Sequence, residues 1–157
     1  MEINLLEKPF GEIDVTNKDE VRDFIARVEQ SALQSAEQVD FNPLVKHHFS
    51  KDVYARELFI PAGTLIVGKI HKHENFNILS QGEMSVLSVD GMQRVTAPFS
   101  VVSSPGVKRM AFAHTDCVWT TIHGTDEKDL EKIEELFIAK TYDDVIEKKE
   151  NLCLGGR

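Results

Sequence analysis

The sequence predicts a mainly β protein of one structural domain, a small barrel of strands with one α-helix before it and one after it. Three observations support this fold class. Apolar residues recur at steps of three and four near each end of the chain, which is the period of an amphipathic helix. Between residues 51 and 124, short runs rich in β-branched residues alternate with turn residues, which is typical of a sandwich or barrel. Strands and helices do not alternate there, so a doubly wound parallel sheet is not expected.

Residues 1–50 are expected to form an extended arm and then an amphipathic helix that packs on the barrel. Asn17, with Glu20 three residues later, matches a capping box, in which each side chain satisfies a free backbone N–H at the helix start. The stripe of apolar residues that would face a core consists of Val21, Phe24, Ile25, Val28, Ala32 and Ala36.

Residues 51–124 are expected to form the barrel. About seven or eight short strands are expected, in the runs 53–60, 64–73, 82–89, 92–106, 108–114 and 117–124. The third of these runs leads into Asp90-Gly91, which is a strong hairpin signal because both residue types tolerate a positive φ.

Residues 125–157 are expected to form a C-terminal helix and a polar tail. Thr125 or Asp126 can cap this helix, and the acidic residues that follow suit the positive end of the helix dipole. The apolar side of the helix consists of Leu130, Ile133, Leu136 and Phe137.

Composition restricts the partners that we expect. The chain has 157 residues and a net charge of -8, so it would repel a phosphate backbone and is not expected to bind nucleic acid. No apolar run reaches the roughly 18 residues that span a membrane. The N-terminus does not match a signal peptide, and two distant cysteines, Cys117 and Cys153, fit free thiols in a reducing compartment. We therefore expect a cytoplasmic protein.

Two segments resemble the conserved motifs of the cupin superfamily. Residues 60–82 resemble the first motif, which has a glycine, the pair His71 and His73, an acidic residue shortly after it and a closing glycine at Gly82. Residues 99–113 resemble the second motif, in which a Pro-Gly turn precedes a strand that bears a third histidine. The resemblance implies a double-stranded β-helix with a site at the barrel mouth, and it implies a homo-oligomer. The chain also resembles small cupin-like proteins of unknown function from tailed bacteriophages, which would place it in the host cytoplasm.

Two of the four metal ligands that the cupin resemblance implies are replaced. Asn77 stands where the family has its acidic ligand, and Arg109 stands where it has the third histidine. An amide oxygen is a poorer ligand than a carboxylate. A guanidinium cannot ligate a metal, because it stays protonated and offers only donors.

The remaining side chains allow two kinds of site. In the first, His71, His73, Asn77 and Arg109 bind a small anionic or sugar-like ligand, because an arginine fork suits a carboxylate or phosphate. In the second, one divalent transition metal (zinc, iron, manganese or nickel) is bound by His71, His73 and His114. His123 is the substitute for the third histidine.

Simpler interpretations of the same residues also stand. The ring N–H groups of His71 and His73 can bond to backbone carbonyls, and Arg109 can pair with Glu83 or Glu57 across strands. If a bulge rotates Arg109 out of the barrel, the metal site regains support.

Three functions follow from these alternatives, and no catalytic residue is assigned in the first. The favoured one is a non-enzymatic cupin-like protein that binds a small anionic or sugar-like ligand or a partner subunit. The alternative is a metal-dependent cupin enzyme, an oxygenase or isomerase, that uses His71 and His73. A further alternative is a structural or assembly component of a phage. A metal-free epimerase is disfavoured, because Tyr54 and Tyr142 lie outside the motif strands and no tyrosine is then placed as an acid.

Overall fold

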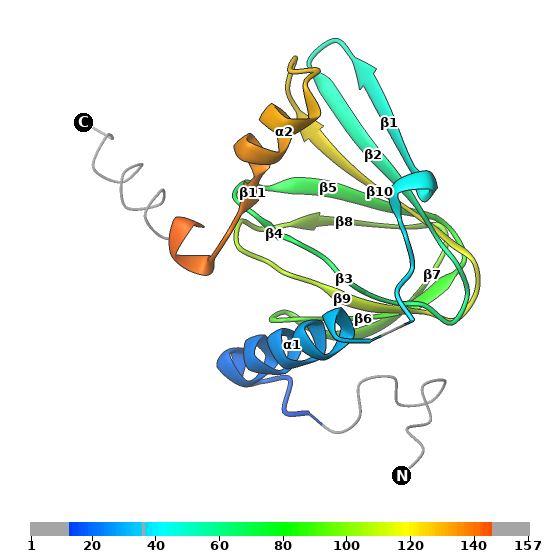
Figure 1. The fold of residues 1–157 in the computed structure, drawn as a ribbon, viewed down its shortest axis with the longest axis vertical. Helices are drawn as coiled ribbons and strands as arrows, with labels where there is room; N and C mark the ends of the chain where they lie inside the picture. The colour runs from blue at the N-terminus through cyan, green and yellow to red at the C-terminus, as the bar shows by residue number, and fades with distance from the viewer. Residues whose placement is uncertain (1–12, 36, 146–157) are drawn as a thin grey trace.

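The computed structural model describes residues 13–35 and 37–145 and shows a barrel of antiparallel strands with two α-helices (Figure 1). The helices are α1 (Lys18–Leu33) and α2 (Leu130–Phe137), and a 3₁₀ turn, η1 (Asn42–Leu44), precedes the first strand. The strands are β1 (Val45–Ser50), β2 (Val53–Ile60), β3 (Leu65–Val67), β4 (Ile70–His71), β5 (Asn75–Gln81), β6 (Glu83–Ser88), β7 (Gly91–Thr96), β8 (Phe99–Ser103), β9 (Met110–Ala113), β10 (Cys117–Gly124) and β11 (Ile138–Ala139).

The strands form two facing sheets and one small ribbon. The larger sheet has the order β1-β2-β10-β5-β8, the second has the order β3-β9-β6-β7, and β11 pairs with β4. Every pair is antiparallel. Strands β2, β10, β5 and β8 in one sheet and β3, β9, β6 and β7 in the other give the strand order of an eight-stranded jelly roll, which is the double-stranded β-helix. The expected fold class is confirmed.

One part of the space between the two sheets is filled by apolar side chains. Alternate residues of each strand point inward, so that the buried cluster draws on both sheets. This cluster consists of Leu58, Ile60, Leu79, Met84, Val95, Ala111, Ala113 and Cys117. Polar inward residues lie beside it and form the candidate site.

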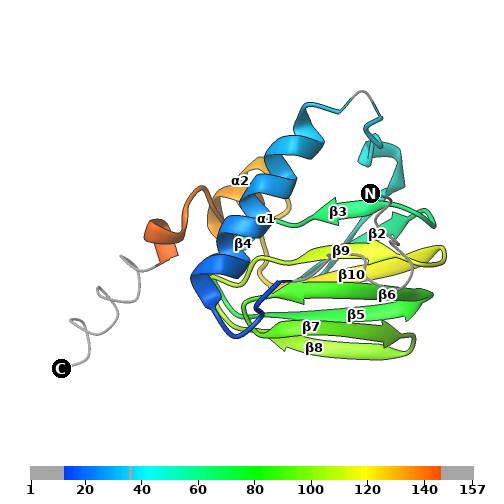
Figure 2. The ribbon, with the colours of Figure 1, turned by 90° about the horizontal axis from the view of Figure 1, so that it is seen from below.

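The two helices cover different parts of the barrel. Val21 and Ile25 of α1 pack against Leu87, Met110 and Phe112, on the outer face of the four-stranded sheet (Figure 2). The second helix, α2, packs on the inner side of β2, where its residues Ile133 and Phe137 contact the inward-facing Tyr54. No helix of the described residues is long and apolar enough to cross a membrane.

The N-terminal helix begins where the sequence predicts. The side chain of Asn17 accepts from the backbone N–H groups of Asp19 and Glu20, and the predicted stripe supplies the buried Val21 and Ile25. Ala36, residues 1–12 and residues 146–157, which include the predicted arm and tail, lie outside the described residues.

The C-terminal helix begins later than predicted. Its cap is Asp129, not Thr125 or Asp126. The carboxylate of Asp126 accepts instead from the backbone N–H of Asp52, 2.6 Å away, so this segment is fixed to the β1–β2 turn. Of the predicted apolar side, Ile133 and Phe137 are buried, whereas Leu130 and Leu136 are exposed.

Several strand boundaries also differ from the prediction. The run 64–73 is broken into β3 and β4, and its last residue, His73, lies in a bend after β4. The hairpin turn consists of Val89 and Asp90, since Gly91 already pairs with Ser88. Three strands, β1, β5 and β11, lie outside the predicted runs. Strand β1 extends the barrel into the segment assigned to the arm and helix, and β11 lies in the segment assigned to the C-terminal helix and tail.

Candidate ligand-binding site

Arg109 points into the barrel. It shares strand parity with Ala111 and Ala113, which belong to the buried cluster between the sheets. Its Nη1 donates a hydrogen bond to the hydroxyl of Ser103, on the inner side of β8 in the opposite sheet. No bulge rotates this side chain outward, so the guanidinium contributes to the interior.

The charge of Arg109 has no carboxylate partner among the described residues. Glu83 pairs with Arg94, and Glu57 pairs with Lys46 and His48, so the predicted cross-strand pairing of Arg109 is not formed. Burial lowers the pKa of Arg109, and the more distant charge of Asp90 partly offsets this effect. A half-buried cation without a counter-ion costs free energy, which a bound anion would recover.

Asn77 shares the hydrogen-bond partner Ser103 with Arg109 and is 3% exposed. Its Nδ2 donates to Asn75 Oδ1 and to Ser103 Oγ, both at 2.8 Å. Its Oδ1 accepts from Trp119 Nε1 at 3.2 Å and from Thr121 Oγ1 at 2.8 Å. All four hydrogen-bonding positions of the amide are therefore used within the protein. Asn77 holds the layer together and has no free group to offer a ligand.

His71 and His123 stack on each other, with ring centroids 5.2 Å apart. The ring of Phe137 also stacks on His123, with centroids 4.2 Å apart. The Nδ1 atoms of both histidines are buried and have no hydrogen-bond partner among the described residues, so the interpretation of His71 as a ring bonded to a backbone carbonyl through Nδ1 does not hold.

Both imidazoles are held in the neutral form. Burial, followed by His123 and the charges of Arg109, Arg56 and Lys69, lowers the pKa of His71 to about 4. Burial and the nearby His73 lower the pKa of His123 to about 4 as well. Protonation would add a further charge to a region that already contains unpaired cations, which is why it is disfavoured.

His73 lies at the edge of this cluster and is exposed. Its ring meets Phe137 edge-on, with centroids 5.9 Å apart. The structure thus brings His71 and His73 to the same region, although only His71 is on a strand.

Tyr54 also belongs to this region, although it lies outside the motif strands. It is buried on the inner side of β2, its hydroxyl lies 2.8 Å from His47 Nδ1, and its ring stacks at 6.4 Å from that of His123. The alternation of residues along β2 predicts that Tyr54 faces inward, because it shares parity with the core residues Leu58 and Ile60.

The residues present do not fit a metal. His114 lies elsewhere, where its Nε2 is 2.7 Å from Ser85 Oγ and its ring contacts Phe112. Within residues 13–35 and 37–145, no three His, Cys, Asp or Glu side chains form a group that could hold a metal ion. His71, His73 and His114 are therefore not brought together, and His123 does not complete such a group. The Arg109 charge and the fully bonded Asn77 occupy the other two positions.

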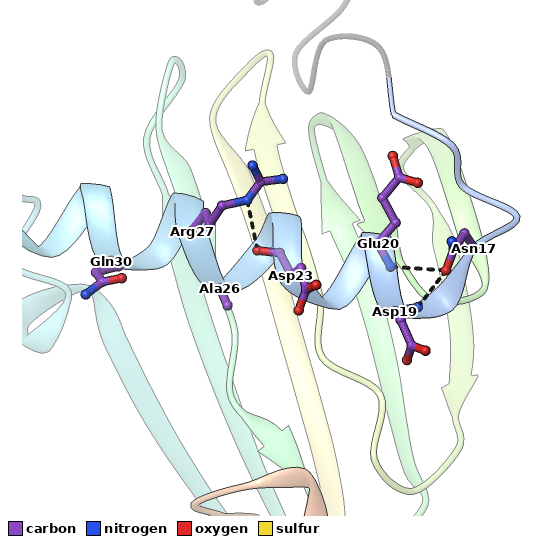
Figure 3. Close-up of a pocket in the computed structure, with 7 residues that line it drawn as sticks. All are labelled: Asn17, Asp19, Glu20, Asp23, Ala26, Arg27 and Gln30. Carbon is purple, nitrogen blue, oxygen red and sulfur yellow. Dashed lines mark hydrogen bonds between the residues drawn. The ribbon is translucent and has the colours of Figure 1, made fainter.

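A separate hollow lies on the outer face of α1 (Figure 3). Its seven lining residues all come from the start and middle of this helix, between Asn17 and Gln30. Arg27 folds back so that its Nε donates to the backbone oxygen of Asp23, and Asn17 is occupied as the helix cap. Charged and capping groups of this kind are ordinary for the solvated face of a helix, and the hollow has no part in the site.

The chain is similar to several solved structures at low sequence identity. No family model and no curated protein matches the sequence. Among solved structures, ectoine synthase from P. lautus is 13% identical, with 68% of this chain and 81% of that chain covered and a TM-score of 0.49. KdgF from Halomonas sp. is 16% identical, with 60% and 90% covered and a TM-score of 0.47.

A third similar structure is an RmlC-like cupin family protein with a double-stranded β-helix fold from Methanocaldococcus jannaschii. It is 16% identical, with 62% of this chain and 98% of that chain covered and a TM-score of 0.45. The neighbours include several cupin proteins. Identities this low concern the fold alone, so the function has to be argued from the residues of this chain.

Proposed function

We propose that this protein binds a small anionic ligand at the inner polar layer of the barrel, with Arg109 as the principal contact. The observation that carries this proposal is the half-buried guanidinium of Arg109, which has no carboxylate partner among the described residues and donates a hydrogen bond to Ser103. A ligand carboxylate or phosphate would supply both the missing negative charge and acceptors for the remaining guanidinium N–H groups.

The surroundings of Arg109 add positive potential. Arg56 shares its inward parity on β2 with the buried Tyr54 and Leu58, is itself exposed, and has no ion pair among the described residues. Lys69 is paired with Glu134. Both Arg56 and Lys69, together with Arg109, lower the pKa of His71, which means that their charges act on one region. Several cations around a partly dehydrated site favour an anion over a neutral or cationic ligand.

The ligand class is narrowed by the neutral groups of the site. The neutral imidazole of His71 can donate or accept one hydrogen bond, and the exposed His73 lies beside the same cluster. A compact acid that also carries hydroxyl groups, such as a sugar acid, would use the arginine fork and these polar edges together. Nothing among the described residues favours an enzymatic or a phage-assembly role, and we propose neither.

Titration calorimetry and thermal shift with acetate, succinate, glucuronate and phosphate at constant ionic strength test the proposal. We expect at least one of these anions to bind the protein and raise its melting temperature. Arg109→Met should abolish binding without lowering the stability of the free protein, because it replaces an unpaired charge with an apolar side chain of similar length. The control Arg27→Met, on the outer face of α1, should bind as the unchanged protein does.

Two results would contradict the proposal. One is equal binding by the Arg109→Met variant, which would place the anion elsewhere. The other is about one transition metal per chain in protein purified without chelators and its loss in the His71→Ala/His73→Ala variant, which would show that the histidines form a metal centre despite the donor set.

A further inference from the structure

The five-stranded sheet has a free edge at β1. Strand β1 lies beyond the eight strands of the jelly roll and pairs with β2 alone, so that it forms the outer margin of the sheet (Figure 1). Among the described residues, no backbone hydrogen bond reaches the other side of this strand. About half of the backbone N–H and C=O groups of β1 can therefore pair with another chain.

This edge is long and regular, whereas the remaining edges are short or closed. The six residues of β1 pair with β2 without a break in register, so no bulge twists the strand away, and no proline interrupts it. Strands β3, β4 and β11 have three residues or fewer. Strands β7 and β8 are joined by residues 97 and 98 alone, which brings these two edges together (Figure 2). Of the described edges, β1 is thus the most accessible to another chain.

The inner side of β1 is neutral and partly apolar. Val45, His47 and Phe49 point to the inner side of the sheet, because they pair with the inward-facing residues of β2. Phe49 is 41% exposed, and its ring lies 5.4 Å from that of Tyr54. Burial, followed by the charge of Arg56, lowers the pKa of His47, so its imidazole is neutral at pH 7. This side suits the apolar side chains of an added strand.

The outer side of β1 is basic. Lys46 and His48 approach the same carboxylate, that of Glu57, at 3.8 and 3.1 Å, so two basic groups share one acidic partner. Both side chains are more than half exposed. Strand β1 contains no acidic residue, although the chain has a net charge of -8, and Asp52 and Asp126 lie only at its turn end. Carboxylates on the outer side of an added strand would therefore be attracted to Lys46 and His48.

We propose that the free edge of β1 binds an extended segment of a partner protein, in which acidic and apolar residues alternate, as one more strand of the sheet. Backbone hydrogen bonds supply the affinity in this mode of recognition, and alternate side chains supply the specificity. The carboxylates lie beside Lys46 and His48, and the apolar side chains lie beside Phe49. A second copy of β1 fits less well, because pairing two of these edges places the basic residues of both copies on one face.

Fluorescence anisotropy with a labelled peptide of alternating glutamate and valine, about eight residues long to cover β1, tests this strand addition. We expect saturable binding, and slower amide hydrogen exchange in residues 45–50 when the peptide is bound. Lys46→Glu should weaken binding on the order of tenfold, because repulsion replaces an exposed ion pair. It should also favour a peptide of alternating lysine and valine. Lys18→Glu, the same change at the exposed start of α1, is the matched control and should bind as the unchanged protein does.

Methylation of the peptide backbone separates strand addition from charge attraction alone. N-methyl groups on alternate residues block the hydrogen bonds along one edge of the peptide and leave every side chain in place. Of two such peptides, one methylated at the glutamates and one at the valines, we expect one to lose binding and the other to keep it. Equal binding of both methylated peptides, or no added protection in residues 45–50, would overturn the proposal.

The proposal does not depend on anion binding at Arg109, and its test can fail separately. The Arg109→Met variant should bind the peptide as the unchanged protein does. Loss of peptide binding in that variant would show that the glutamates enter the barrel and do not reach the edge. A peptide that binds none of the proteins would also overturn the proposal, whether the edge stays solvated or is covered by a second copy or by another part of the same chain.

Discussion

The indole of Trp119 determines how the amide of Asn77 is oriented. Nε1 of Trp119 can only donate, and it lies 3.2 Å from Asn77 Oδ1. The Nδ2 group of Asn77 must therefore face Asn75 and Ser103, and Ser103 in turn accepts from Arg109. This chain of hydrogen bonds positions the guanidinium of Arg109 from the far side of the barrel. Asn77, at the position where the cupin motif has its acidic metal ligand, thus helps to hold the cationic side chain of Arg109 in place.

Asn77→Asp tests this role with a nearly isosteric change. The aspartate keeps the acceptor for Trp119 but turns a donor into a carboxylate oxygen that faces Asn75 Oδ1. We expect a loss of about 2–3 kcal/mol in the free energy of unfolding at neutral pH, the cost of unsatisfied and repelling buried groups. Because burial raises the pKa of the new carboxyl, protonation should restore a donor and the loss should shrink at mildly acidic pH.

Urea unfolding of the unchanged protein and of Asn77→Asp, at neutral and at mildly acidic pH, gives the difference in the free energy of unfolding at each pH. Asn42→Asp, the same change at an exposed position of η1, should cost little at either pH. A loss for Asn77→Asp that does not change with pH would mean that the carboxylate is solvated or neutralised by Arg109.

The sequence predicted the regular strands well and the site only in part. The runs 53–60 and 117–124 coincide with β2 and β10, because each alternates clearly and is bounded by turn residues. Strand β5 is hidden because two of its inward positions are the asparagines Asn75 and Asn77. The sequence pattern places the start of α2 too early, because the hydrogen bond between Asp126 and Asp52 joins residues 74 positions apart, which no local pattern shows.

At the site, the inward direction of Arg109 depends only on strand parity and the absence of a bulge, so it could be predicted as one of two alternatives. The complete hydrogen bonding of the Asn77 amide could not be predicted, because its partners Ser103, Trp119 and Thr121 come from two other strands. The stack of His71 on His123 likewise depends on the pairing of β4 with β11 and on the position of α2. Contacts of this kind arise from topology and not from spacing along the chain.

Acid should destabilise the protein through its two buried histidines. In the folded protein the pKa values of His71 and His123 are lowered to about 4, from an ordinary value of 6.5. Between these values the unfolded chain binds more protons than the folded one, so stability is complete above about pH 6.5 and is lost as the pH falls toward 4. His123→Phe removes one of these groups and keeps an aromatic ring against Phe137.

We therefore expect His123→Phe to lose less unfolding free energy than the unchanged protein between neutral pH and pH 4.5, measured by urea unfolding at several pH values. The variant His71→Phe/His123→Phe should flatten the dependence further. If the slopes of stability against pH are the same in all three proteins, the histidines titrate normally and the acid sensitivity has another source.

The closing glycine of the first motif, Gly82, has a packing role that a second glycine can isolate. Gly82 has φ +90, and a Cβ there would overlap the carbonyl oxygen of Asp116 and approach Cys117 Sγ at 2.7 Å. Gly63 has a similar φ of +79, but its Cβ would meet nothing within 4 Å. Alanine at either position incurs about 1–2 kcal/mol for a left-handed backbone. Only Gly82→Ala also forces apart the Gly82 backbone and the β9–β10 connection, which contains Asp116.

We expect Gly63→Ala to lower the free energy of unfolding by about 1 kcal/mol and Gly82→Ala to lower it by about 3 kcal/mol or more. Urea unfolding of the two variants side by side measures the difference, with circular dichroism to show that each has folded. Because both substitutions place alanine at a positive φ, the difference mainly reports the overlap. Equal losses would show that the loop at Asp116 can move aside, and that Gly82 is required for its backbone conformation only.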